Sequence, residues 1–139
     1  MNASIIIDCS ITMSWCFSDE ATPATMAIQD RLVSERALVP MHWFLEVTNV
    51  LAMAERHRRI SRTKSSHFLT LLDTMDIEVD AETAGRAFVH LLPLCRSHGL
   101  TSYDAAYLEL ALRRRLPLAS LDDRLRSTTK SLGIEVLGR

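Results

Sequence analysis

The chain has 139 residues, of which 47% are hydrophobic and 24% charged, as is typical of a single globular domain rather than a disordered chain. Sixteen Lys and Arg against seventeen Asp and Glu leave a net charge of −1. This balance excludes a global basic field for nucleic acid, so any such binding would rest on local patches. Because no secretory signal or membrane-spanning apolar run is visible, we expect a cytoplasmic protein that does not engage a membrane.

Short apolar runs of strand length alternate along the chain with longer stretches of helical period. Residues 4–7, the first run, are continuous and largely β-branched, as in a strand buried on both faces. The alternation predicts an α/β fold with a parallel sheet in one domain over residues 1–139. The predicted strands are residues 4–7, 37–39, 77–79, 116–120 and 134–137.

Helix start and stop signals place helices between these strands. Ser10 can cap a short helix, and Thr22 precedes a proline as an N-cap does. Asp80 is expected to cap a long helix that is kinked at Pro93 and ends at Gly99. The predicted helices are residues 10–17, 23–36, 42–58, one opening at 61, 80–99, 101–115 and 123–132.

Four carboxylates fall at strand ends or in the first turns of helices. Asp8 directly follows the first predicted strand and Asp122 the fourth, whereas Glu46 and Asp104 lie near helix starts. In an open α/β sheet, ligands bind outside the carboxyl ends of the strands. We therefore expect these four acids to share one site.

Four acids in one site need protonation or a cation, because two like charges about 4 Å apart repel by about 4 kcal/mol at an effective dielectric near 20. Carboxylate oxygens in this number suit Mg²⁺ or Mn²⁺. The three cysteines have no C-x-x-C spacing and no histidine is expected at a strand end, so zinc fits poorly. The predicted chemistry is metal-assisted hydrolysis of a phosphodiester, with none of the histidines catalytic.

Each acid also has a structural explanation. Asp104 completes a T-x-x-D variant of the capping box, Glu46 favours the positive end of its helix, and Asp122 or Asp123 can be an ordinary N-cap. Asp8 is harder to explain in this way, since a lone acid at the end of an apolar strand gains nothing for the core. Jointly the four favour a functional site.

Four segments in this order carry a family resemblance: IIIDCS at residues 5–10, a P-x-x-x-x-x-E-x-x-N-x-L pattern at 40–51, LTSYDAAYL at 100–108 and LASLD at 118–122. They resemble PIN-domain proteins, and more narrowly the VapC-type toxins of bacterial type II toxin–antitoxin systems. The resemblance covers nearly the whole chain. It implies a three-layer α/β/α PIN-like fold with a central, mostly parallel sheet of about five strands.

The resemblance also implies roles for individual residues. Asn49, one helical turn after Glu46, is expected to orient it. Asp123 stands where the family often has a basic residue, so the fourth acid is either Asp122 or Asp123, and the motif register favours Asp122. The implied catalytic and metal-binding residues are Asp8, Glu46, Asp104 and Asp122, supported by Ser10, Asn49 and Ser120.

By resemblance, the chain is expected to be a Mg²⁺-dependent endoribonuclease, with Mn²⁺ as a substitute, that cleaves tRNA or rRNA and inhibits translation. The implied partners are an RNA substrate, a VapB-like antitoxin and a second copy in a homodimer. The alternatives are a PIN nuclease for RNA processing or DNA, and a catalytically silent module that binds RNA or protein.

Local basic patches are the expected RNA contacts. One lies at a helix–helix junction, a second is the run of residues 113–115, and a third is Arg124 with Arg126. Phosphate binding needs such charge beside the acids, although basic residues in a last helical turn also complement the helix dipole. The residues predicted to bind RNA are Arg56, Arg58, Arg59, Arg62 and Arg124.

Overall fold

Five strands form one parallel sheet in the order β3-β2-β1-β4-β5 in the computed structural model, which describes residues 1–139. Every neighbouring pair is parallel, which confirms the predicted α/β class. Strand β1 lies at the centre, with β2 on one side of it and β4 on the other. Because all three strands are parallel, their carboxyl ends lie next to one another at the same edge of the sheet. The strands are β1 (Ala3–Ile7), β2 (Arg36–Pro40), β3 (Ile77–Asp80), β4 (Leu118–Ala119) and β5 (Val136–Leu137).

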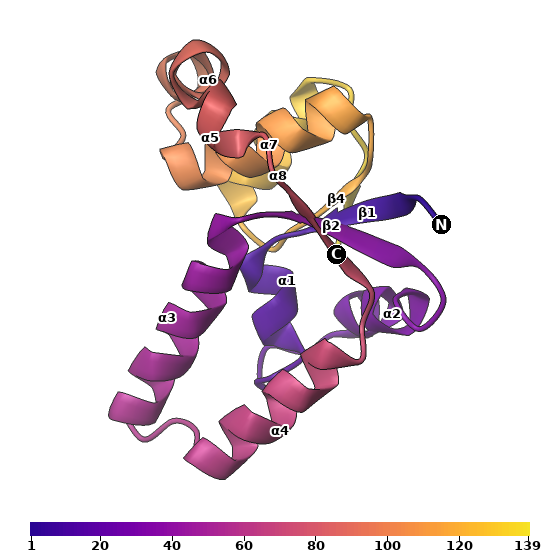
Figure 1. Ribbon diagram of the computed structural model, residues 1–139, viewed down its shortest axis with the longest axis vertical. Coiled ribbons are helices and arrows are strands. Elements are labelled where there is room, and N and C mark those ends of the chain that lie inside the picture. The colour runs from indigo at the N-terminus through magenta and orange to yellow at the C-terminus, as the bar shows by residue number, and fades with distance from the viewer.

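Helices cover both faces of the sheet, giving the three layers of an α/β/α fold (Figure 1). Helices α1 to α4 lie on one side, and α5 to α8 lie on the other. No helix is long and apolar enough to cross a membrane. The helices are α1 (Cys9–Ser14), α2 (Pro23–Arg31), α3 (His42–Arg56), α4 (Arg62–Asp73), α5 (Thr83–Arg86), α6 (Leu92–His98), α7 (Ser102–Arg114) and α8 (Asp123–Ser131), with a π-helical turn η1 (Ala87–Leu91) before α6.

The core lies around the central strand. Ile5, Ile6 and Ile7 of β1 are fully buried, as expected for a strand covered on both faces. Tyr107 of α7 packs on one side and Trp43 of α3 on the other, both almost completely buried. The site at the end of β1 therefore stands on a rigid support.

Two predicted helices differ from the structure in their bounds. The first begins at Cys9 because Asp8, not Ser10, is its N-cap and accepts a hydrogen bond from the Ile11 N–H. The second ends at Arg31 instead of residue 36, because Arg31 pairs with Glu35 across a turn that leads into β2.

The predicted long helix over residues 80–99 is wrong as a continuous element. Asp80 ends β3, and the segment divides into α5, the π-helical turn and α6. Pro93 lies in the first turn of α6, where its missing N–H interrupts the ladder of the preceding turn. Gly99 closes α6 in the left-handed conformation, with φ 65°, as predicted for a helix C-terminus.

Candidate active site

Asp8 is held at the junction of β1 and α1. Its Oδ1 accepts hydrogen bonds from the Ser10 hydroxyl at 2.6 Å and the Ile11 N–H at 3.0 Å, and its Oδ2 accepts one from the Ser120 hydroxyl at 2.5 Å. Burial raises the pKa of Asp8, while these hydrogen bonds act in the opposite direction. The carboxylate is thus fixed in one orientation but costs free energy to ionise.

Ser10 and Ser120 also connect the two strand ends. The Ser10 hydroxyl accepts a hydrogen bond from the Leu121 N–H at 2.8 Å, and the Ser120 hydroxyl accepts one from the Asp122 N–H at 3.1 Å. Both serines therefore contact Asp8 and the loop that follows β4. Their place beside the first acid is the place expected from the sequence.

Asp104 lies in the first turn of α7, where its N–H donates to the Thr101 hydroxyl at 3.2 Å. Burial, followed by the charges of Asp122, Asp8 and Glu46 in that order, raises the pKa of Asp104 to about 6. All four predicted acids therefore lie within electrostatic reach of one another, on four different segments of the chain.

Asp122 and Asp123 have different surroundings, which bears on the identity of the fourth acid. Asp122 caps α8 by accepting from the Leu125 N–H at 2.8 Å, and its charge acts on Asp104. The Asp123 side chain is 83% exposed and pairs with Arg139. Asp122 thus lies with the other acids, and Asp123 belongs to the surface.

Glu46 is oriented by a residue that the sequence analysis did not identify. The buried Tyr107 hydroxyl donates to Glu46 Oε1 at 2.6 Å. Asn49 is exposed and makes no hydrogen bond to Glu46, so the contact expected from it is absent. The available signal was the spacing of Tyr107 three residues after Asp104, which places both on one face of α7.

His42 is a second missed neighbour, and the expectation that no histidine follows a strand is wrong. It is the second residue after β2 and opens α3. Its Nε2 lies 3.5 Å from Glu46 Oε1 and 3.0 Å from the Tyr103 carbonyl oxygen, and its ring packs edge-on against Tyr107 at 5.0 Å. An Nε2–H that donates to this carbonyl leaves Nε2, the ring nitrogen nearest Glu46, without a lone pair for a metal.

Cys9 adjoins the acids but is unsuited to bind a metal. Burial raises the pKa of the Cys9 thiol to about 12, and the charges of Glu46, Asp8 and Glu20 contribute. A thiol in this environment stays protonated at neutral pH, and only the thiolate is a good ligand or nucleophile. The chemistry of the site therefore belongs to its carboxylates.

The donor set fits a hard divalent cation, although the side chains do not form a ready-made cage. No three His, Cys, Asp or Glu side chains come together in a geometry that could hold a metal ion. Asp8, Glu46 and Asp122 each accept a hydrogen bond from a donor of the protein, which fixes the orientation of the three carboxylates. Neighbouring carboxylate charges contribute to the raised pKa of Asp8 and of Asp104, and carboxylate oxygens are the ligands that Mg²⁺ and Mn²⁺ prefer.

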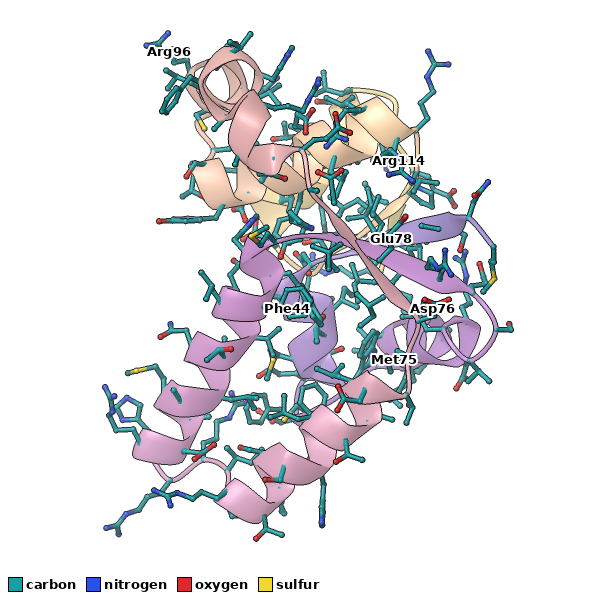
Figure 2. The ribbon with its side chains drawn as sticks, viewed as in Figure 1. Phe44, Met75, Asp76, Glu78, Arg96 and Arg114 are labelled. Carbon is teal, nitrogen blue, oxygen red and sulfur yellow. The ribbon has the colours of Figure 1, made fainter.

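The structure places the predicted basic patches in different surroundings. Arg113 is half-buried, and its guanidinium donates to the buried Asp80 and Glu109 at 2.8 to 3.3 Å. Arg114 pairs with Glu78 of β3 at 3.6 Å (Figure 2). The run at residues 113–115 is therefore mainly structural, and its expected role as an RNA contact is wrong for Arg113.

The arginines singled out for RNA binding do not all surround the acids. Arg124 donates to the Gly99 carbonyl oxygen at 2.9 Å. Arg59 pairs with Asp19 and Glu20. Arg56, Arg58 and Arg62 are exposed at the end of α3 and the start of α4, at the far tip of the α3–α4 pair in Figure 1.

Comparison with known proteins gives a consistent fold. The chain is similar to PAE2754 from Pyrobaculum aerophilum, with 22% identity and a TM-score of 0.72 over 98% of this chain and 92% of that one. It is also similar to VapC20 of Mycobacterium tuberculosis, a sarcin–ricin loop cleaving toxin, with 14% identity and a TM-score of 0.59 over 94% and 96% of the two chains. FitAcB from Neisseria gonorrhoeae shares 16% identity, with a TM-score of 0.57 over 95% of both chains.

At the level of sequence, no curated protein matches the chain. The family model of the PIN domain matches residues 5–131, a span that contains all four acids, most of β1, and the whole of β2, β3 and β4. The chain therefore belongs to the PIN domain family.

Proposed function

We propose that the chain is a Mg²⁺-dependent endoribonuclease of the VapC type, the toxin of a type II toxin–antitoxin pair, and that residues 1–139 act as one PIN domain. The observation that carries this proposal is the electrostatic coupling of four carboxylates at the carboxyl edge of the sheet, visible in the pKa of Asp104. A site that disfavours ionisation of its own acids is complementary to a divalent cation.

In this proposal, Asp8, Glu46, Asp104 and Asp122 hold Mg²⁺, with Mn²⁺ as a substitute. The cation, when bound, activates water and offsets charge on the scissile phosphate. The protein contributes fixed ligands. Ser10 and Ser120 donate to the carboxylate of Asp8, and such supporting hydrogen bonds set ligand orientation and affinity.

Tyr107 has the corresponding role for Glu46. Burial raises the pKa of the Tyr107 phenol, and the charge of Glu46 adds to this, so the hydroxyl keeps its proton at any physiological pH. Its hydrogen bond to Glu46 Oε1 therefore fixes the position of that carboxylate oxygen. Tyr107 is thus a positioning residue of the proposed reaction.

RNA is the proposed substrate, with tRNA or rRNA as its source and arrest of translation in the cytoplasm as the result. VapC20, which shares the fold, is a sarcin–ricin loop cleaving toxin. FitAcB shares the fold as well, as does a protein of a toxin–antitoxin complex from Klebsiella pneumoniae. These relatives support a toxin over the alternatives of an RNA-processing or DNA nuclease and a silent binding module.

We also propose two protein partners, a VapB-like antitoxin and a second copy of the chain in a homodimer. Phe88 and Val89 of the π-helical turn are 89% and 71% exposed, and Leu45 of α3 is 72% exposed. Large apolar side chains that are this exposed are found at surfaces that contact other proteins. Light scattering of the purified chain should give twice the monomer mass of 15.7 kDa, and Phe88→Glu should give the monomer if this side chain lies in the dimer contact.

Cleavage of total bacterial RNA by the purified chain tests the enzymatic proposal. Four parallel reactions contain Mg²⁺, Mn²⁺, EDTA, or the Asp8→Asn variant with Mg²⁺. Discrete fragments that need both a metal and Asp8 are expected. Asn keeps the shape of the side chain and an oxygen that can accept the hydrogen bond from the Ile11 N–H. The circular dichroism spectrum of the variant should therefore match that of the unaltered chain.

Three outcomes would contradict the proposal. Fragments that persist in EDTA would rule out a metal-dependent site. Absence of RNA cleavage, together with cleavage of a single-stranded or flap DNA under the same conditions, would favour the DNA nuclease. Binding of RNA without cleavage of either nucleic acid would favour the silent module.

A further inference from the structure

A large basic cavity lies between the end of α3 and the start of α4. Its volume is about 680 Å³, and its lining includes five cationic side chains and one carboxylate, Glu55. Only two lining residues are hydrophobic. The five cations are Arg56, Arg58, Arg59, Arg62 and Lys64.

Most of these cations have no strong partner within the protein. Arg56 makes only a weak contact with the Met53 sulfur at 3.6 Å, and Arg62, 95% exposed, lies 4.0 Å from Glu55. Arg58 and Lys64 form no ion pair, and no side-chain hydrogen bond of theirs is formed. A group of cations that repel one another and are not paired internally is complementary to an external anion.

Arg59 forms a fixed wall of the cavity. Its guanidinium pairs with Asp19 and Glu20 at 3.1 and 2.7 Å and lies 3.8 Å from the centre of the Phe17 ring. These contacts tie the α3–α4 turn to the segment after α1. Arg59 is thus held in place by its contacts, while the other four cations of the cavity remain available for a ligand.

The cavity is connected to the acids by one face of α3. Glu46 and Arg56 are ten residues apart on this helix, which corresponds to about 15 Å. Met53 lies seven residues after Glu46, and therefore on the same face of α3. The Arg56 guanidinium contacts the Met53 sulfur. A stacked nucleic-acid strand covers this separation with about four or five nucleotides, at about 3.4 Å each.

From these observations we propose that the α3–α4 cavity is a subsite for the phosphodiester backbone of RNA, several nucleotides away from the bond that is cut. This inference rests on the proposed ribonuclease function and adds a length requirement to it. Lys and Arg side chains position a backbone without reading its bases, so the subsite contributes affinity rather than sequence preference. An acidic protein segment is the alternative ligand; the nucleic-acid strand is favoured because the cavity lies on the same helix as Glu46, about 15 Å away, so that one strand could contact both.

The test compares two charge-matched double variants. Arg56→Gln/Lys64→Gln removes two cavity cations. Arg96→Gln/Lys130→Gln removes two exposed cations elsewhere, on α6 and α8, and Arg96 lies at the opposite end of the molecule from the α3–α4 turn (Figure 2). Both variants change the net charge by the same amount, so a general loss of attraction for RNA cancels in the comparison.

Binding is measured by fluorescence anisotropy in EDTA, where the proposed cleavage cannot occur, with labelled single-stranded RNA probes of 20 and of 4 nucleotides. Each phosphate contact adds about 0.7 to the salt slope for a single strand, which is about fivefold in affinity near 0.1 M salt. The cavity variant should therefore bind the 20-mer about 25-fold more weakly, with a salt slope lower by about 1.4. The 4-mer should lose less affinity than the 20-mer in the cavity variant, because its three internal phosphates are too few to occupy the cavity fully while the strand extends toward the acids.

Arg58→Gly is a variant in which the loss of a cavity cation is not accompanied by backbone strain. Arg58 has a φ of 58°, a left-handed conformation that Gly adopts without strain. This variant should be at least as thermally stable as the unaltered chain and should also bind the 20-mer more weakly, by about fivefold. A stable variant with weakened binding separates the ligand role of the charge from a structural one.

Unchanged affinity and salt slope for the 20-mer in the cavity variants would overturn the inference. So would an equal loss in the control variant, or a labelled poly-glutamate peptide that binds the cavity more tightly than the 20-mer does. The proposed function fails separately: if the chain cleaves no RNA with Mg²⁺ while the cavity variant still loses RNA binding, the subsite stands without the nuclease. If the chain cleaves RNA and the variants bind normally, only the subsite fails.

Discussion

Asp104→Asn is expected to stabilise the metal-free protein while it abolishes cleavage. The pKa of Asp104 is raised from 3.8 to about 6 by burial and by the charges of Asp122, Asp8 and Glu46. Because the folded-state pKa exceeds the unfolded one, ionisation of Asp104 opposes folding. The penalty is absent below pH 3.8, grows as the pH rises and is complete above about pH 6.

The size of this penalty follows from the pKa difference. At about 1.4 kcal/mol per pH unit the difference corresponds to about 3 kcal/mol, and screening of a half-exposed group reduces it to about 1.5 kcal/mol. Asp104 also lies in the first turn of α7, where a negative charge contributes about 0.5 kcal/mol that the variant loses. The net gain in unfolding free energy is about 1 kcal/mol, or about 3–4 °C in Tm.

Thermal unfolding of both proteins in EDTA, near pH 7.5 and near pH 4, measures the effect. The variant should melt at the higher temperature near pH 7.5, and the two should nearly coincide near pH 4. Mg²⁺ should raise the Tm of the unaltered chain and not that of the variant. Asp123→Asn, which alters an exposed acid, serves as the control. A variant that melts at or below the temperature of the unaltered chain at pH 7.5 would refute the coupling of the four acids.

Three other substitutions test separate contacts. Asp122→Asn should abolish RNA cleavage and keep the fold, since Asn is an equally good N-cap, whereas Asp123→Asn should stay active; the reverse result would move the fourth acid by one residue. Tyr107→Phe should lower kcat at least tenfold through Glu46, with a loss of about 1 kcal/mol in urea unfolding, and unchanged kcat would exclude a positioning role. Arg113→Ala should cost about 3 kcal/mol in urea unfolding, because it leaves the buried Asp80 carboxylate without an ion-pair partner, whereas Glu109 keeps its pair with Arg86; a loss under 1 kcal/mol would contradict this.

Local pattern was sufficient to predict the sheet. Ile5, Ile6 and Ile7 form a continuous β-branched run that only a doubly covered strand tolerates, and the structure buries them completely. The acids could be assigned to one edge because the end of a parallel strand is a position that topology fixes. Asp8 and Asp122 follow β1 and β4, which are neighbours in the sheet.

Contacts between residues far apart in the sequence could not be predicted from local sequence patterns. Tyr107 and Glu46 are 61 residues apart and meet because α7 and α3 pack at the same end of β1 and β2. Asn49 was expected in this role because sequence spacing reports only neighbours on one helix. His42 was read as the start of a helix, and its approach to the Tyr103 carbonyl depends on the packing of α7.

The same limit explains the wrong assignments in the basic patches and the long helix. A run of arginines at the end of α7 is consistent with a surface patch, and only the position of Asp80 at the end of β3 shows that Arg113 is paired. The π-helical turn at Ala87–Leu91 precedes a helix with Pro93 in its first turn. A kink was the expected outcome of that proline, and the structure divides the segment instead.

Metal binding tests the central claim, the divalent-cation site formed by the four acids, most directly. Mn²⁺ is titrated into the purified chain and followed by electron paramagnetic resonance of the free ion, with Asp8→Asn, Glu46→Gln, Asp104→Asn and Asp122→Asn in parallel and Asp123→Asn as the control. If the four acids form the cation site, the unaltered chain and the control should bind Mn²⁺ alike, and each of the four variants should bind it at least tenfold more weakly. Binding that is unaffected by all four substitutions, or no binding at millimolar Mn²⁺, would contradict it.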